Sequence, residues 1–177
     1  MKSPRKMAFI IVVLLQVLLL LGMVFKRVHL LKTGKVVRLG CRPVDPRSLL
    51  SGDYVELTYI AADLPRVRNK IVGTDIKARS AVYVAVEKKK DSDTWDAVAY
   101  SMERKKVEGP DRVILRGRVK RRNGRVRFGV EQYFVPQFQG LRIEREIAKV
   151  TVDVAVSDDG ECAIKRLYIA GKEVTFY

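Results

Sequence analysis

The sequence predicts a mainly β protein in which one N-terminal transmembrane helix precedes a compact β-barrel or sandwich-like domain of about nine short strands. Three observations support this fold class. Residues 7–25 form an uncharged apolar run, later segments alternate between apolar and polar residues, and turns rich in Gly, Asn and Asp separate those segments. The chain therefore divides into an anchor, residues 1–27, and a β-rich domain, residues 28–177.

The anchor prediction depends on the run from Met7 to Phe25, 19 residues that only Gln16 and Gly22 interrupt. As a helix it would extend roughly 28 Å, close to the hydrocarbon thickness of a bilayer. A cleaved signal peptide is the alternative. However, the run is longer than a usual signal core and leads into Lys26-Arg27 without a small-x-small cleavage pattern. An uncleaved signal-anchor is therefore the favoured interpretation.

Charge bears on the orientation of the domain and on its partners. Basic residues flank both ends of the apolar run, so the positive-inside rule does not decide the orientation. A short N-terminus before a long domain is typical of a signal-anchor, and we expect the domain outside the cytoplasm. The formal net charge of +15 would draw the chain to anionic surfaces, of which the lipid headgroup layer is the nearest.

Alternating segments and turns give the predicted strands. Asn123-Gly124 predicts a two-residue hairpin turn, because both residues tolerate positive φ. A helix near residues 141–149 is the one helical candidate of any length within the domain. Apolar and polar residues alternate most clearly over residues 82–86, 113–119, 126–130 and 150–156, and further strand candidates lie near residues 35–42, 54–60, 95–101, 161–169 and 173–177.

The predicted hairpin would gather cations on one face. With a two-residue turn, Lys120 faces Arg127, Arg118 faces Gly129, Arg116 faces Glu131, and Val119 packs with Phe128 on the opposite face. An ordinary solvated strand surface is one interpretation. Like charges across a ladder are destabilising, however, which favours contact with lipid headgroups; no aromatic residues interleave the arginines as nucleic acid would require. The six cations are Arg116, Arg118, Lys120, Arg122, Arg125 and Arg127.

The most unusual stretch runs from Arg42 to Tyr59. Two prolines around Asp45 predict a rigid turn, and Gly52-Asp53 predicts the entry to a strand whose Val55, Leu57 and Tyr59 share one face. These residues resemble the signature of the bacterial GDYXXLXY family. The residues that carry the resemblance are Pro43, Asp45 and Pro46 of the lead-in, Gly52, Asp53, Tyr54, Leu57 and Tyr59 of the signature, and Glu131, Tyr133, Phe134 and Pro136 of a second block.

The resemblance covers nearly the whole chain, with one departure: Gln137-Phe138-Gln139-Gly140 replaces an expected Glu. It implies a single-pass protein of the bacterial cell membrane. Members of this family are often encoded beside polytopic membrane proteins, so it also implies a polytopic partner. The function that follows is an extracytoplasmic binding or assembly domain, and the resemblance assigns it no particular chemistry.

A serine hydrolase similar to signal peptidase is the alternative function. Ser48 or Ser51 would be the nucleophile before Gly52-Asp53, and Lys88–Lys90 the source of a general base. The register is poor, because Pro43 occupies the position where that motif has serine. Asp53, Tyr54 and Glu131 could instead line a polar ligand pocket, although structural roles for them are favoured.

Metal and cofactor chemistry has little support in the sequence. His29 is the single histidine and adjoins the anchor, and no Gly-rich phosphate loop or Cys-x-x-Cys pair is present. We predict no metal site and no cofactor. Cys41 and Cys162 are either a disulfide of an exported domain or two buried apolar residues, and the sequence leaves both interpretations open.

Overall fold

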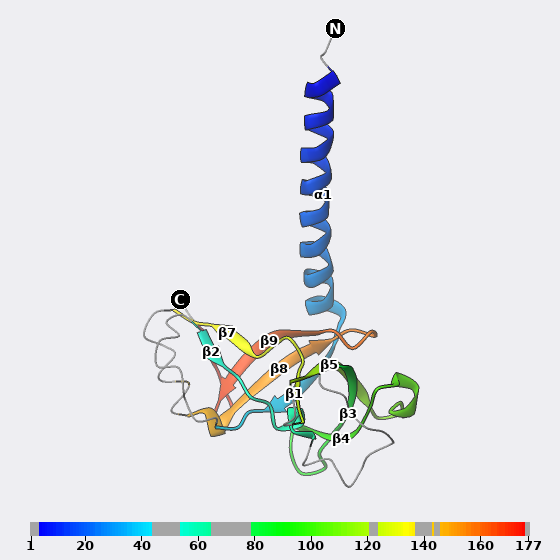
Figure 1. Cartoon of the computed structure of the whole chain (residues 1–177). Coiled ribbons are helices and arrows are strands. Elements are labelled where there is room, and N and C mark those ends of the chain that lie inside the picture. Colours follow the sequence, from blue (N-terminus) through cyan, green and yellow to red (C-terminus); the bar gives the residue numbers. More distant parts are fainter. Residues whose placement is uncertain are drawn as a thin grey trace.

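The computed structural model describes residues 4–43, 54–64, 79–120, 124–136, 143 and 146–175. A long helix, α1 (Pro4–Thr33), stands on a β domain (Figure 1). Short 3-10 turns cover Ile60–Ala62, Arg104–Lys106 and Ile147–Lys149. The strands are β1 (Lys35–Gly40), β2 (Tyr54–Glu56), β3 (Ala81–Lys88), β4 (Trp95–Ser101), β5 (Val113–Lys120), β6 (Arg125–Arg127), β7 (Gln132–Phe134), β8 (Val150–Val156), β9 (Cys162–Ile169) and β10 (Lys172–Glu173).

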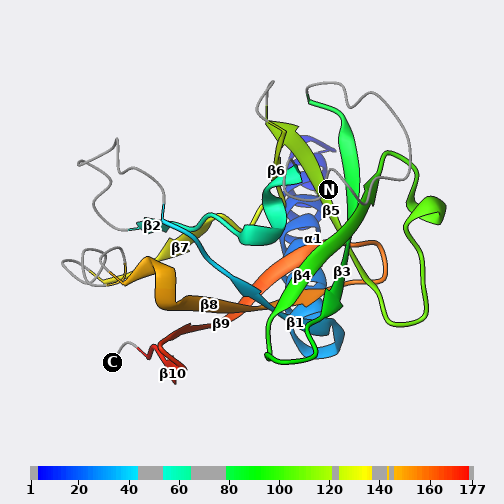
Figure 2. The same ribbon diagram turned by 90° about the horizontal axis from the view of Figure 1, so that it is seen from below.

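Eight of these strands form one curled mixed sheet. Its order is β10-β9-β8-β1-β4-β3-β5-β6, in which β1 and β4 pair in parallel and the other neighbours pair antiparallel. The curl brings the turn between β8 and β9 against β5, where the Arg116 N–H donates to the Gly160 carbonyl at 2.8 Å. Seen from below, the sheet is a half-barrel (Figure 2).

Residues 54–64 cross the open side of the half-barrel. Strand β2 pairs with β7 in a separate two-stranded ribbon. Backbone bonds then join this segment to the chain after β1 and to the residue before β6: Arg42 N–H donates to Thr58 O at 2.9 Å, and Leu64 N–H donates to Gly124 O at 3.1 Å. The crossing segment therefore closes the core from one side.

The helix is fixed to the domain at its C-terminal end. It continues past the apolar run, and Leu30 packs against Ala155 and Ala163 of β8 and β9. The Gly34 N–H donates to Leu30 O at 2.9 Å, and a Cβ at Gly34 would lie 2.6 Å from that oxygen. Glycine is therefore required where the helix turns into β1, and no linker separates the two elements.

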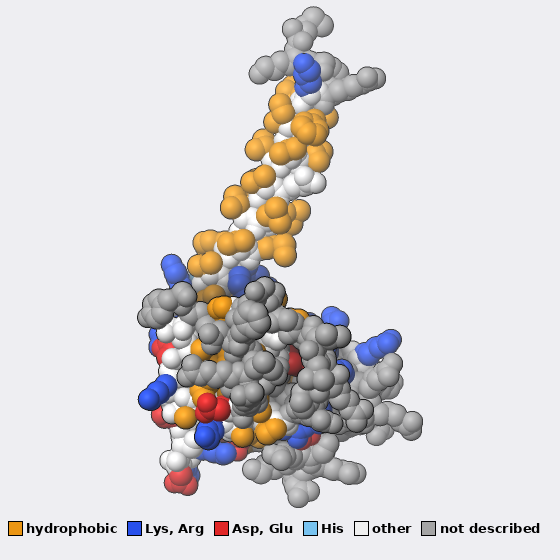
Figure 3. Space-filling view, turned by 90° about the vertical axis from the view of Figure 1, so that its left-hand side faces the viewer, with side chains coloured by type: hydrophobic (Ala, Val, Ile, Leu, Met, Phe, Trp, Pro, Cys, Tyr) orange, Lys and Arg blue, Asp and Glu red, His pale blue; other side chains and the backbone are white. Residues whose placement is uncertain are grey.

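The span of α1 over Lys6–Thr33 is long and apolar enough to cross a membrane. Its large apolar side chains from Met7 to Val28 lie on the outside of the molecule, away from the domain (Figure 3).

The mainly β prediction after one long apolar helix is confirmed. The predicted segments 95–101 and 150–156 coincide with β4 and β8. The described residues form ten strands, one more than the nine predicted segments, because β7 was not expected. The helix expected near 141–149 lies partly outside the described residues; Ile143 is helical, and Ile147–Lys149 forms a 3-10 turn.

The predicted register of the basic hairpin is also wrong. Arg118 pairs with Arg127 and Lys120 pairs with Arg125, two residues away from the expected partners. The last described pair is Lys120 with Arg125, and residues 121–123 between them lie outside the described residues. Because the shift is even, each side chain keeps its predicted face. Val119 and Val126 are buried, whereas Arg116, Arg118, Lys120, Arg125 and Arg127 are exposed.

Candidate functional site

The signature residues that the structure describes lie in or beside the core. Val55, Leu57 and Tyr59 are fully buried, as predicted for one face of a strand. The Tyr59 hydroxyl donates to Val130 O at 2.6 Å, and burial raises its pKa well above the ordinary value. Tyr54 is half-buried and meets Phe134 edge-to-face, with ring centroids 6.3 Å apart. Asp45, Pro46, Gly52 and Asp53, like Arg122 and the candidate nucleophiles Ser48 and Ser51, lie outside the described residues.

The second block has a structural role around Glu131. Its carboxylate accepts hydrogen bonds from the backbone N–H groups of Phe128 and Gly129. Gly129 has φ of 81°, a conformation that glycine adopts without strain, so the carboxylate stabilises a tight turn after β6. Burial raises the pKa of Tyr133. Pro43 and Pro136 are exposed.

Both cysteines are free thiols in the core. Cys41 and Cys162 are buried, and desolvation raises the pKa of each thiol to about 12. The Cys162 thiol lies 3.5 Å from the Gly160 carbonyl. The sequence left open a disulfide or two buried apolar residues, and in the structure the two cysteines are buried and unbonded.

The described residues contain no arrangement of catalytic side chains. Every described lysine, including Lys88–Lys90, is exposed. A lysine that acts as a general base is usually desolvated in an apolar pocket, and none of these lysines is buried. The buried Ser101 accepts a hydrogen bond from the Glu103 N–H instead of facing a base. No group of three His, Cys, Asp or Glu that could hold a metal occurs in the described part of the chain.

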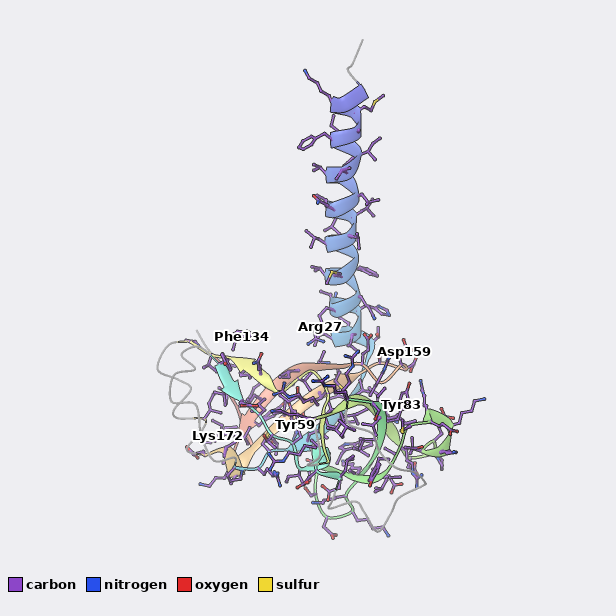
Figure 4. The ribbon with its side chains drawn as sticks, viewed as in Figure 1. Arg27, Tyr59, Tyr83, Phe134, Asp159 and Lys172 are labelled. Atoms are coloured by element: carbon purple, nitrogen blue, oxygen red, sulfur yellow. The ribbon has the colours of Figure 1, made fainter. Side chains whose placement is uncertain are left out.

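A basic pocket of about 800 Å³ lies at the root of α1, and we call it the root pocket. Figure 4 shows Arg27 at the base of the helix, and in Figure 1 β5 lies directly below the helix end. The floor of the root pocket comes from β5 and β6, one wall from the start of β9, and the roof from α1. Its cationic residues are Arg27, Arg79, Arg116, Arg118, Lys120 and Arg127, and its acidic residues are Glu131 and Glu161.

The charges of the root pocket are unbalanced. The Glu131 carboxylate accepts hydrogen bonds from backbone N–H groups, and Glu161 pairs with Lys26 outside the pocket at 2.8 Å. One N–H of the Arg27 guanidinium donates to the Cys162 carbonyl at 2.8 Å. The side chains of Arg79, Arg116, Arg118 and Lys120 have no hydrogen-bond or ion-pair partner within the described residues, so most of the positive charge is uncompensated.

Another arginine of the same sheet shows the opposite arrangement. On the outer face of β1 and β8, Arg38 donates to both oxygens of the buried Asp153, at 2.7 and 3.1 Å. Tyr168 donates to the same carboxylate at 3.0 Å, and its ring lies 4.4 Å from the Arg38 guanidinium carbon. The protein therefore pairs this arginine fully, which makes the unpaired cations of the root pocket a distinct feature.

Sequence reasoning identified four of the six cations, Arg116, Arg118, Lys120 and Arg127. It placed Arg125 with them, but Arg125 does not line the root pocket. It missed Arg27 and Arg79. The position of Arg27, two residues after the apolar run, could have indicated its place at the root. No sequence signal connects Arg79 with the hairpin.

These features define a class of protein: a β half-barrel held on one long apolar helix, with its described signature residues in or beside the core. The model of the GDYXXLXY protein family matches residues 16–167. The chain belongs to this family. Searches among curated proteins and among solved structures found no significant match.

Proposed function

We propose that this chain is a membrane-anchored assembly domain, held outside the cytoplasm beside a polytopic membrane protein. The observation that carries the proposal is the rigid junction between helix and domain. Leu30, Arg27 and Lys26 join the last turns of α1 to β8 and β9, and Gly34 connects the helix to β1 without a linker. A helix in a bilayer would thus hold the half-barrel in one orientation at the surface.

A fixed orientation suits assembly more than substrate capture. A flexible tether lets a domain search, whereas a rigid one presents the same face to whatever shares the membrane. The large apolar side chains of α1 make no contact with the described domain over Met7–Phe25. They are thus available to lipid and to the helices of a partner. The partner class itself follows from the family resemblance.

Phe134 supports a contact on the helix side of the domain. Its side chain is 74% exposed, the highest value among the large apolar residues of the described domain. Figure 4 shows Phe134 level with Arg27, on the side from which the helix leaves, and Lys172 farther from the membrane end. An exposed aromatic residue at the height of the headgroups suits contact with lipid or with a neighbouring membrane protein.

Site-specific photo-crosslinking in native membranes tests the assembly proposal. A photoreactive residue at Phe134 of the full-length chain should give an adduct with a protein of several transmembrane spans, identified by mass spectrometry. The same probe at Lys172, which is exposed and distant, is the control and should give none. Equal adducts from both positions, or adducts only with soluble proteins, would contradict the proposal.

The proposed side of the membrane needs a separate test. Asp159, in the exposed turn between β8 and β9, is suitable for Asp159→Cys because the native Cys41 and Cys162 are buried and should react slowly. A membrane-impermeant maleimide should label Asp159→Cys in intact cells and leave the wild-type chain unlabelled. Labelling only after the cells are opened would place the domain in the cytoplasm.

A further inference from the structure

We infer that the root pocket binds the phosphate of an anionic glycerophospholipid headgroup. This inference rests on the proposed membrane position of the domain and adds a specific ligand to it. It concerns one defined pocket rather than the general attraction of a basic protein to a charged surface.

The depth of the root pocket matches the headgroup layer. Arg27 follows Phe25, the last residue of the apolar run, by two positions, or about 3 Å of helix rise. With the apolar run in the hydrocarbon core, Arg27 lies at the phosphate level. Strands β5 and β6 also line the root pocket, and their cations lie below Arg27. A lipid beside α1 would therefore present its phosphate to the pocket.

The charges of the root pocket match an anion. Arg118 lies directly opposite Arg127 in the β5–β6 ladder, an arrangement that destabilises an isolated hairpin. Neither pocket carboxylate is hydrogen-bonded to these guanidinium groups, because Glu131 accepts from backbone N–H groups and Glu161 pairs with Lys26. Arg127 makes one long ion pair with Glu56, at 3.7 Å and outside the pocket, and Arg118 has no partner in the described part of the chain. Arginine pairs with phosphate oxygens through two parallel N–H bonds, and two facing arginines can share one phosphate.

The exposed face of β5 supplies residues that can be changed without disturbing the core. Arg116, Arg118 and Lys120 alternate with the buried Leu115, Gly117 and Val119. Their side chains have no partner in the described part of the chain, so neutral replacements remove charge alone. A control set of the same total charge lies at the end of β3 and just after it, where Lys88, Lys89 and Lys90 are exposed. Lys88 and Lys89 differ from the β5 cations in that they pair with Asp93 and Asp96.

Native mass spectrometry of the full-length chain in detergent micelles tests the inference. The probes are phosphatidylglycerol and the zwitterionic phosphatidylcholine at equal concentration. The wild-type chain should retain phosphatidylglycerol about tenfold more than phosphatidylcholine, since each cation near a lipid phosphate favours the anionic lipid. R116Q/R118Q/K120Q should reduce this preference by about tenfold, whereas K88Q/K89Q/K90Q should keep it. Unchanged Trp95 fluorescence would show that both variants remain folded.

Three outcomes would overturn the inference. Equal retention of the two lipids would remove the anion preference, and equal losses in the two triple variants would indicate diffuse charge. Displacement of phosphatidylglycerol by inorganic phosphate at the same concentration would assign the root pocket to a soluble phosphate compound. None of these results affects the Phe134 crosslink, so failure of the lipid site and failure of the assembly proposal are distinguishable.

Discussion

The interior of the half-barrel and the outer face of β5 use the same strand in opposite ways. Inward, Leu115 and Val119 join a core in which Tyr59 satisfies its hydroxyl on a backbone carbonyl. Outward, Arg116, Arg118 and Lys120 stand without partners in the described part of the chain. Of the described signature residues, Leu57 and Tyr59 belong to the interior and Tyr54 is half-buried. The signature marks the fold, whereas the residues suited to binding lie on a face that the signature does not include.

The largest effect that separates the two faces is expected from Leu57→Ala. Leu57 is fully buried where residues 54–64 cross the core, and its truncation should cost about 2–5 kcal/mol of unfolding free energy. Urea unfolding of the full-length chain in detergent, followed by the fluorescence of the single tryptophan Trp95, measures this. Val36→Ala is the control, because Val36 is 39% exposed and should cost less. Equal costs would mean that the crossing segment does not contribute to the core.

A smaller effect is expected from Tyr59→Phe. The substitution keeps the ring but leaves the Val130 carbonyl without its 2.6 Å hydrogen bond inside the core. An unpaired buried acceptor should cost about 1–2 kcal/mol in the same unfolding measurement. Tyr83→Phe, on a half-buried ring of β3, serves as the comparison. A neutral Tyr59→Phe would show that the signature tyrosine acts by volume alone.

High pH tests the interior in a third way. Cys41 and Cys162 have pKa values raised to about 12, whereas an unfolded thiol ionises near 9.0. Above pH 9 the unfolded chain loses protons that the folded chain retains, so stability is fully present below pH 9 and falls toward pH 12. At pH 10 the loss should be on the order of 1 kcal/mol for each thiol. Cys41→Ala should flatten the fall; an unchanged slope would mean that Cys41 ionises in the folded chain.

The sequence predicted the elements whose pattern is local. Alternation located β8 to the residue, the further candidate near residues 95–101 coincides with β4, and the shared face of Val55, Leu57 and Tyr59 was confirmed. The sequence analysis missed β7, which follows the left-handed Gly129. This strand has only three residues, too few to show an alternating pattern. The predicted hairpin register was wrong, because Asn123-Gly124 favours a two-residue turn whereas pairing of Lys120 with Arg125 leaves four residues between them.

The root pocket was beyond local patterns for a different reason. Its parts come from α1, the approach to β3, the β5–β6 hairpin and the start of β9, which only the curl of the sheet brings together. The bond between Arg116 and Gly160 closes that curl, and it joins two backbones whose sequence shows no sign of the contact. Alternation could place cations on a face, but it could not say which distant arginines shared that face.

The smallest effect is expected on the outer face, from Arg118→Gln. Removing one of two arginines that face each other across β5 and β6 should change stability by no more than about 0.5 kcal/mol, in the stabilising direction, because cross-strand repulsion is relieved. Urea unfolding at low salt in micelles of neutral detergent measures it, and high salt should abolish the gain by screening.

The matched comparison is Arg38→Gln, which removes an arginine whose carboxylate partner is buried. Asp153 would keep its bond from Tyr168 but lose both bonds from Arg38, so this variant should be destabilised by about 1–3 kcal/mol. The two substitutions remove the same charge from the same sheet. If Arg118→Gln destabilised the chain as much as Arg38→Gln, Arg118 would stabilise the fold. The cations of the root pocket would then not be free to bind an anion. Opposite signs for the two variants would instead show that Arg118 is retained at some cost to stability, as expected of a residue kept for binding.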